Sequence, residues 1–384
     1  MVEESARSRI EPFRVMDVFA AAARRQETHG DVVSLAAGQP STRAPGPVLA
    51  AMRTALDDDV IGYSETLGTA RLRATIAAYL STRSQVVIEA EDVVVTTGSS
   101  GAFTLLFLAA FDAGDTVVMA RPGYPAYRNT LSALGCRVVE LDCGEDVRFQ
   151  PTVAMLDALP EPPKGLIIAS PANPTGTIID PDELAALARW CDEHGTLLIS
   201  DEIYHGISYG DVECRSAREF SDGAVSIGSV SKYFSMTGWR LGWMVLPRSL
   251  TRAVQRLASN MTVCPPTVSQ LAAVAAFTDE SLAELDGHVR RYARNREELL
   301  GGLRDAGITR LAPADGAFYA YADIGHLTDD SFRWCADTLN ETGVAVVPGA
   351  DFDTVHGHHT VRFSFAGATE DITEALRRLA PRLR

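Results

Sequence analysis

Three short runs of the sequence combine residue types that handle charge and protons. They are Ser229-Val-Ser-Lys232-Tyr-Phe-Ser-Met-Thr-Gly-Trp-Arg240, Asp201-Glu-Ile-Tyr204 and Asn173-Pro-Thr-Gly176. A lysine amine can bind an aldehyde covalently, and a carboxylate can hold a proton on a ring nitrogen. Hydroxyl and amide groups can hydrogen-bond a phenolate, and a guanidinium can bind a phosphate. Together these groups form a chemically complete set for holding an aldehyde-bearing ring.

The elements that must position these residues are strands alternating with helices. We expect strands at Asp92–Thr97, Thr116–Ala120, Arg137–Leu141, Gly165–Ser170, Thr196–Ser200 and Ala224–Gly228. Helical patterns cover Ala102–Phe111 and Pro181–His194, the second with Asp180 as a candidate N-cap. This alternation predicts an α/β fold in which helices sandwich a mostly parallel sheet on both faces.

The candidate residues follow the carboxyl ends of these strands. Asp201, Asn173, Ser100 and Tyr124 each come after an apolar run. Open α/β sheets bind their ligands at this edge. The run Gly98-Ser-Ser100-Gly also leads into a helix expected from Ala102, and free N–H groups at a helix N-terminus favour an anion. Ser99 and Ser100 are therefore candidate phosphate ligands.

The length of the chain indicates two lobes around a cleft. It has 384 residues, of which 46% are hydrophobic, and this exceeds the size at which one core keeps growing. The pattern then shifts to a charged amphipathic segment from about Ser281 to Arg304, followed by Pro313–Ala322, Ser331–Thr342 and a closing helix near Asp371–Arg384. We predict a large domain over 48–280, and a smaller α+β domain formed by 281–384 with the segment 1–47.

Charge and cysteine usage exclude several classes of function. A formal net charge of −15 argues against binding nucleic acid or an anionic membrane. The six cysteines are scattered, and the amino terminus has no export signal, so we expect free thiols and a cytoplasmic protein. His356-Gly-His358-His359 has no acidic or cysteine partner at ligand spacing, and we expect no metal site there.

From Ala-Ala-Gly38-Gln-Pro to Val-Arg362-Phe-Ser-Phe, the motifs resemble in order and spacing those of class I/II aminotransferases of fold type I. The full pattern also looks similar to bacterial aspartate and valine–pyruvate aminotransferases. The resemblance implies pyridoxal 5'-phosphate as cofactor and a homodimer with shared active sites. It further implies ping-pong transfer of an amino group from an L-amino acid to a 2-oxo acid.

The resemblance also implies a role for each candidate residue. Lys232 would bind the cofactor covalently and move the proton at the substrate Cα, while Asp201 would pair with the ring nitrogen. The remaining cofactor ligands would be Asn173 and Tyr204 at the ring oxygen, Tyr124 on the ring face, and Ser99, Ser100, Ser229 and Arg240 at the phosphate, with Tyr63 reaching across from a partner subunit. The substrate carboxylate would meet Arg362, Gly38 and Asn173.

Substrate choice is the point at which the sequence departs from members that use aspartate. Those members hold the distal carboxylate with a loop lysine and two small hydroxyl residues, and the matching positions here are Ser100, Phe13 and Val15. Burying an unpaired carboxylate is costly, so we expect neutral donors of the alanine or valine type, with pyruvate or 2-oxoglutarate as acceptor. Arg14 could supply the missing charge, which leaves aspartate as an alternative.

Two alternatives from other classes share parts of this pattern. Pyridoxal-phosphate-dependent C–S lyases use the same lysine, aspartate, tyrosine and arginine. A non-catalytic, pyridoxal-phosphate-sensing regulator would need an additional DNA-binding module, and only 37 residues precede Gly38. Ser229-x-x-Lys232 also matches a β-lactamase motif, but the companion Ser-Asp-Asn and Lys-Thr-Gly motifs do not occur.

Overall fold

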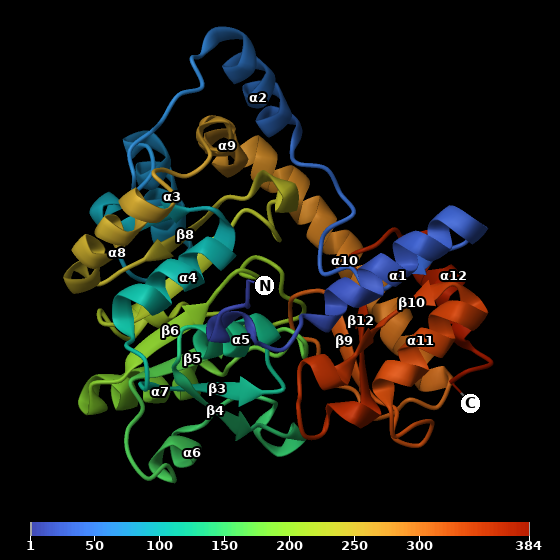
Figure 1. The fold of residues 1–384 in the computed structure, drawn as a ribbon. Coiled ribbons are helices and arrows are strands. Elements are labelled where there is room, and N and C mark those ends of the chain that lie inside the picture. The colour runs from blue at the N-terminus through green and yellow to red at the C-terminus, as the bar shows by residue number, and fades with distance from the viewer. Residues whose placement is uncertain (1, 384) are drawn as a thin grey trace.

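The computed structural model describes residues 2–383 and has an α/β sheet at its centre (Figure 1). Within these residues, seven strands pair in the order β2-β8-β7-β6-β5-β3-β4. β8 is antiparallel to both neighbours, and the remaining pairs are parallel. The bounds are β2 Val93–Thr96, β3 Thr116–Arg121, β4 Arg137–Asp142, β5 Gly165–Ala169, β6 Leu197–Asp201, β7 Val225–Ser229 and β8 Gly242–Val245. This arrangement confirms the expected mostly parallel sheet, although the short strand β8 was not expected.

Helices bury both faces of this sheet because successive side chains of a strand point in opposite directions. In β6, Leu198 packs in one apolar cluster with Leu187 of α7, while Ile199 packs in another with Phe107 of α4. The helices on the Ile199 face are α4 Gly98–Ala110, α5 Pro125–Ala133 and α8 Arg248–Met261, and those on the Leu198 face are α6 Val153–Asp157 and α7 Pro181–His194.

A second group of elements lies beside the sheet and includes α1 and the last helix, α12 (Figure 1). An antiparallel sheet has the order β11-β12-β9, and β1 pairs in parallel with β10. The strands are β1 Val33–Ser34, β9 Tyr319–Asp323, β10 Val344–Ala345, β11 Val347–Pro348 and β12 Thr360–Ser364. The helices are α1 Arg14–His29, α10 Asp279–Asp305, α11 Ser331–Thr342 and α12 Thr369–Leu379. Arg384, the end of the expected closing helix, lies outside the described residues.

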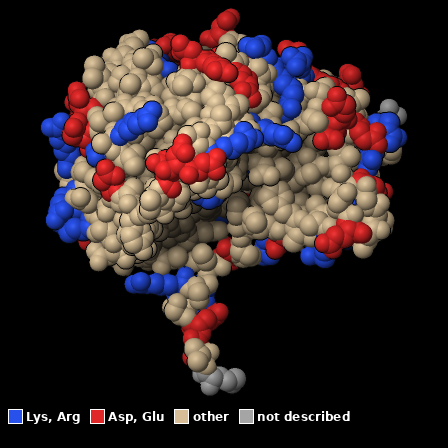
Figure 2. All heavy atoms as spheres, turned by 90° about the horizontal axis from the view of Figure 1, so that it is seen from above, with Lys and Arg blue, Asp and Glu red and all other residues tan. Residues whose placement is uncertain are grey.

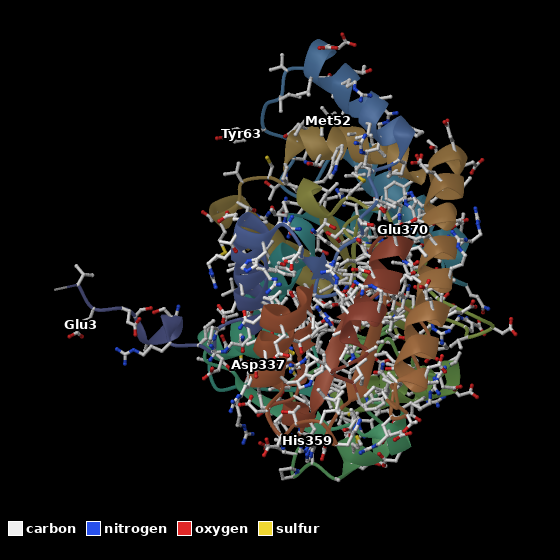
Figure 3. The ribbon with its side chains drawn as sticks, turned by 90° about the vertical axis from the view of Figure 1, so that its right-hand side faces the viewer. Glu3, Met52, Tyr63, Asp337, His359 and Glu370 are labelled. Carbon is white, nitrogen blue, oxygen red and sulfur yellow. The ribbon has the colours of Figure 1, made fainter. Side chains whose placement is uncertain are left out.

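Three further helices pack together above the sheet in Figure 1. They are α2 Gly46–Asp58, α3 Ala70–Arg83 and α9 Thr267–Ala273. The segment around Glu3 projects from the body as an arm, and Glu3 lies well away from the other labelled residues (Figure 3). No helix among residues 2–383 is long and apolar enough to cross a membrane. All six cysteines are free thiols.

Candidate active site

A cavity of about 570 Å³ lies at the carboxyl edge of the large sheet, between that edge and helix α1. A hollow lined mostly by uncharged residues is visible in the space-filling view (Figure 2). The cavity brings together most of the residues that the sequence predicts for the site. They are Gly38, Ser99, Ser100, Tyr124, Asn173, Asp201, Tyr204, Lys232, Arg240 and Arg362.

Lys232 lies in the turn after β7, with its amine inside the cavity. Its Nζ donates a hydrogen bond to the Gly38 carbonyl at 2.7 Å and lies 5.8 Å from the centre of the Tyr204 ring. Burial lowers the pKa of Lys232 to about 8, with the Arg362 charge acting in the same direction. A neutral, nucleophilic amine is therefore accessible close to neutral pH.

Asp201 is the last residue of β6, and only 3% of its surface is exposed. One carboxylate oxygen accepts the N–H of Ile203 at 3.1 Å, and the other accepts the hydroxyl of Tyr127. Burial raises the pKa of Asp201 to about 6, while these two bonds and the Lys232 charge oppose the rise. The carboxylate is thus charged at neutral pH and suited to hold a proton on a ring nitrogen.

Arg362 lies in β12 between two aromatic rings. Its Cζ is 4.3 Å from the ring centre of Tyr319 and 4.8 Å from that of Phe352. Nη1 donates to Asn173 Oδ1 at 2.9 Å, and Nη2 donates to the Ala36 carbonyl at 3.0 Å. Its buried Nε has no hydrogen-bond partner in the described part of the chain. Because buried donors are normally paired, this guanidinium is prepared for an external acceptor such as a carboxylate.

The part of the cavity beside α4 and Arg240 is suited to an anion. Helix α4 starts at Gly98, four residues before the expected Ala102, so that part of our expectation was wrong. The Gly-Ser-Ser-Gly run has weak helix formers, but burial of Ala102, Leu105 and Leu106 overrides that preference. Ser99 and Ser100 therefore lie in the first turn of α4, where N–H groups are unpaired.

Gly98 and Arg240 meet closely at this end. Gly98 has a φ of +70°, and a Cβ there would lie 2.6 Å from Arg240 Nη2. The guanidinium also donates to the Thr237 carbonyl at 3.1 Å through Nη1. A glycine is required by both the backbone conformation and the contact, so that the arginine can approach the helix N-terminus.

Two predicted phosphate ligands do not line this cavity. The Ser229 hydroxyl donates to the Leu241 carbonyl at 3.3 Å and accepts the Ser231 N–H at 2.8 Å, and it is Ser231 that faces the cavity. Tyr63 is 88% exposed and points outward near α2 (Figure 3). Its proposed role in a partner's site is compatible with that exposure.

Two buried tyrosines at the site escaped the sequence analysis. Tyr127 bonds Asp201, and the Tyr319 hydroxyl lies 2.7 Å from the hydroxyl of Tyr204. Tyr127 had a weak signal, since it follows Tyr124 by three residues on a helix and so shares its face. Tyr319 had none, because it belongs to the apolar run of a strand in the second group of elements.

Comparison with known proteins identifies a family. The model of the aminotransferase class I and II family matches residues 30–379. A valine–pyruvate aminotransferase of Mycobacterium tuberculosis is 57% identical over 97% of this chain and 96% of its own. An aspartate/prephenate aminotransferase of Thermus thermophilus is 34% identical over 91% of this chain and 90% of its own.

Solved structures agree with these relatives. A crystal structure of an aminotransferase from Mycobacterium tuberculosis has a TM-score of 0.98 and 55% identity, and 99% of each chain is covered. The aspartate aminotransferase from Thermus thermophilus with maleate has a TM-score of 0.94 and 33% identity, covering 99% of this chain and 100% of its own. These matches confirm the resemblance inferred from the motifs and the fold type.

Proposed function

The chain belongs to the class I and II aminotransferases and is a transaminase, and from that premise we propose that it binds pyridoxal 5'-phosphate through Lys232 and uses neutral L-amino acids as donors. The amino group passes to a 2-oxo acid such as pyruvate or 2-oxoglutarate in a ping-pong sequence. The substrate assignment rests on one observation. The cationic side chains lining the cavity are Lys232, Arg240 and Arg362, which serve the amine, the phosphate and the α-carboxylate, so none is left for a distal carboxylate.

The cavity has the groups that pyridoxal phosphate requires. Asp201 supplies an anion, and Arg240 with the N-terminus of α4 supplies cationic and N–H groups. The Lys232 amine donates to the Gly38 carbonyl and lies near the Tyr204 ring. The proposed ligands that line the cavity are Ser99, Ser100, Tyr124, Asn173, Asp201, Tyr204, Lys232 and Arg240, with Tyr63 contributed to the site of a second copy.

When bound, pyridoxal phosphate supplies an aldehyde that takes up an amino group and a ring that withdraws electrons. Lys232, whose pKa is lowered to about 8 by burial, is able to remove and return the proton at the substrate Cα. Arg362 binds the substrate carboxylate through its unpaired Nε, and its stacked rings fix the plane of the fork. Asp201 stays ionised at neutral pH and holds a proton on the ring nitrogen.

Charge inside the cavity supports neutral donors. The cationic residues among those lining it are Lys232, Arg240 and Arg362, which serve the amine, the phosphate and the α-carboxylate. Arg14 does not line the cavity, because its guanidinium lies 3.6 Å from Asp17 and 5.8 Å from the centre of the Phe332 ring. A distal carboxylate would be left unpaired, at a cost of several kcal/mol.

The shape of the wall supports the same assignment. Phe13, Val15, Met16 and Phe19 line the side formed by α1, and they offer apolar contacts to an aliphatic side chain. The 57% identical relative is named for valine and pyruvate, which favours that pair. The 34% identical relative is named for aspartate and prephenate, so aspartate is the alternative to be tested.

We also propose a cytoplasmic homodimer. Val60, Ile61 and Tyr63 are apolar or aromatic yet exposed at 95%, 43% and 88%. A bond from the Thr267 hydroxyl to the Gly62 carbonyl, 2.6 Å long, ties this loop to α9. Such an exposed apolar loop suits contact with a second copy, and the six free cysteines suit a reducing compartment.

A panel of half-reactions tests the function. The pyridoxal form is mixed with alanine, valine, aspartate and glutamate, and its conversion to the pyridoxamine form is followed by absorbance. Alanine or valine should react at least tenfold faster than aspartate, given the cost of an unpaired carboxylate. Faster reaction of aspartate would refute the neutral assignment. Ammonia released from cysteine without a 2-oxo acid would instead identify a C–S lyase.

A further inference from the structure

The start of helix α1, which forms the apolar wall, is held by a residue far away in the sequence. Phe13 occupies the N-cap position but makes no capping bond. Instead, the carboxylate of Asp351 accepts the N–H of Arg14 at 3.3 Å and the N–H of Val15 at 3.1 Å. Asp351 is only 4% exposed. An anion satisfies the free N–H groups of a helix start, so this carboxylate anchors α1.

Asp351 belongs to a short turn that also contacts the rest of the cavity wall. The turn, η7 Gly349–Asp351, follows β11. The Asp351 carbonyl accepts Arg128 Nη2 of α5 at 3.3 Å, and Phe352, the next residue, stacks on Arg362. The Phe352 carbonyl also accepts the Gly123 N–H at 3.0 Å. The turn η7, with Phe352, therefore connects α1, which forms the apolar wall, to α5 and to Arg362.

We propose that Asp351 is a positioning residue for substrate selection, an inference that rests on the proposed function. An amino acid held by its α-carboxylate at Arg362 has to fit its side chain between that arginine and the wall at Phe13 and Val15. Asp351 fixes the start of α1, and its neighbour Phe352 supports Arg362. Asp351 therefore sets the distance between the apolar wall and Arg362. That separation limits the size of the side chain that the site accepts.

The test compares Asp351→Ala with Asp351→Asn in the holoenzyme. Asparagine keeps one acceptor oxygen for one of the two N–H groups but places an N–H donor against the other, whereas alanine removes both acceptors. We expect Asp351→Ala to lower the preference for small over bulky donors, measured as the kcat/KM ratio of alanine to phenylalanine, by about fivefold. Asp351→Asn should lower this ratio less than Asp351→Ala does, because it keeps one of the two acceptors. Dissociation constants of unreactive 2-methyl amino acids, from spectral titration, should change in the same way, with the cofactor affinity unchanged.

Asp330→Ala is the matched control. Asp330 caps α11 in the same group of elements by accepting the Arg333 N–H at 3.0 Å, and it does not line the cavity. The Asp330→Ala variant should be less stable than the wild type, but its kcat/KM ratio of alanine to phenylalanine should be unchanged. If Asp351→Ala does not fold, Asp351→Ser, which removes the charge and shortens the reach, takes its place.

An unchanged ratio in a folded Asp351 variant, or an equal change in Asp330→Ala, overturns the inference. The proposed function fails separately, because it depends on which donor the wild-type enzyme prefers and not on any variant.

Discussion

Replacing Tyr127 by phenylalanine should move the pH range in which the enzyme works. The Tyr127 hydroxyl donates to Asp201, whose pKa burial has already raised to about 6. A hydrogen bond to a charged group is worth about 1.5–3 kcal/mol, and one pKa unit corresponds to about 1.4 kcal/mol. Loss of the donor destabilises the charged carboxylate, so the pKa of Asp201 should rise by about one to two.

The measurement is the pH profile of kcat/KM for the preferred donor. Activity that needs a charged Asp201 is lost as the pH falls through its pKa, so the acidic limb should shift upward in Tyr127→Phe. The apoprotein provides a second measurement. Because the folded pKa exceeds the unfolded value of about 3.9, Asp201 contributes stability at low pH that is lost as the pH rises through about 6. In Tyr127→Phe, this loss of stability with rising pH should continue to a higher pH than in the wild type.

Tyr209→Phe is the control for loss of a buried hydroxyl. The Tyr209 hydroxyl donates to the Ala317 carbonyl at 2.6 Å, and no acidic side chain among residues 2–383 bonds it. Its removal should cost about 1 kcal/mol of stability and leave the acidic limb in place. The acidic limb of the pH profile could instead be unchanged in Tyr127→Phe, or could shift equally in Tyr209→Phe. Either result would show that Tyr127 does not control the pKa of Asp201.

Three further outcomes follow from the contacts of the site. Lys232→Ala should fold but should no longer attach the cofactor covalently. Borohydride reduction followed by mass spectrometry measures this attachment, and full activity of the variant would contradict the role of Lys232. Arg362→Ala should lower kcat/KM for amino acids by about 10² to 10³-fold while the cofactor dissociation constant changes little, because a buried charged pair is worth about 3–5 kcal/mol. Gly98→Ala should weaken cofactor binding about tenfold, since a positive φ costs about 1–2 kcal/mol and the new Cβ meets Arg240, and unchanged binding would argue against a phosphate site there.

The large sheet was predictable because its strands are buried on both faces. Continuous apolar runs such as Gly165–Ala169 then stand out, and expected strand ends agree with observed ones within one residue. Residues at the carboxyl ends of these strands, Asp201 and Asn173 among them, could be placed for the same reason. The strand β8 was missed, because four residues between a glycine-containing turn and Pro247 give little periodicity.

Contacts between distant parts of the chain were not predictable. The bond from Arg14 to Asp351 spans 337 positions, and neither residue belongs to a motif. Tyr319 resembles an ordinary core residue until β9 is placed beside Tyr204. Periodicity reports which side of an element is buried, but it does not report which element covers that side.

The distribution of charge explains why substrate choice has to depend on such distant contacts. Lys232, Arg240 and Arg362 are the cationic groups lining the cavity, and in the proposed function each would serve any amino-acid donor, whatever its side chain. Discrimination between donors is therefore left to the apolar surface of α1, where one methylene changes binding by only about 1–3 kcal/mol. Such a small difference is preserved only if the surface is held in place. A buried carboxylate on its first two N–H groups holds it without adding a charge that faces the substrate.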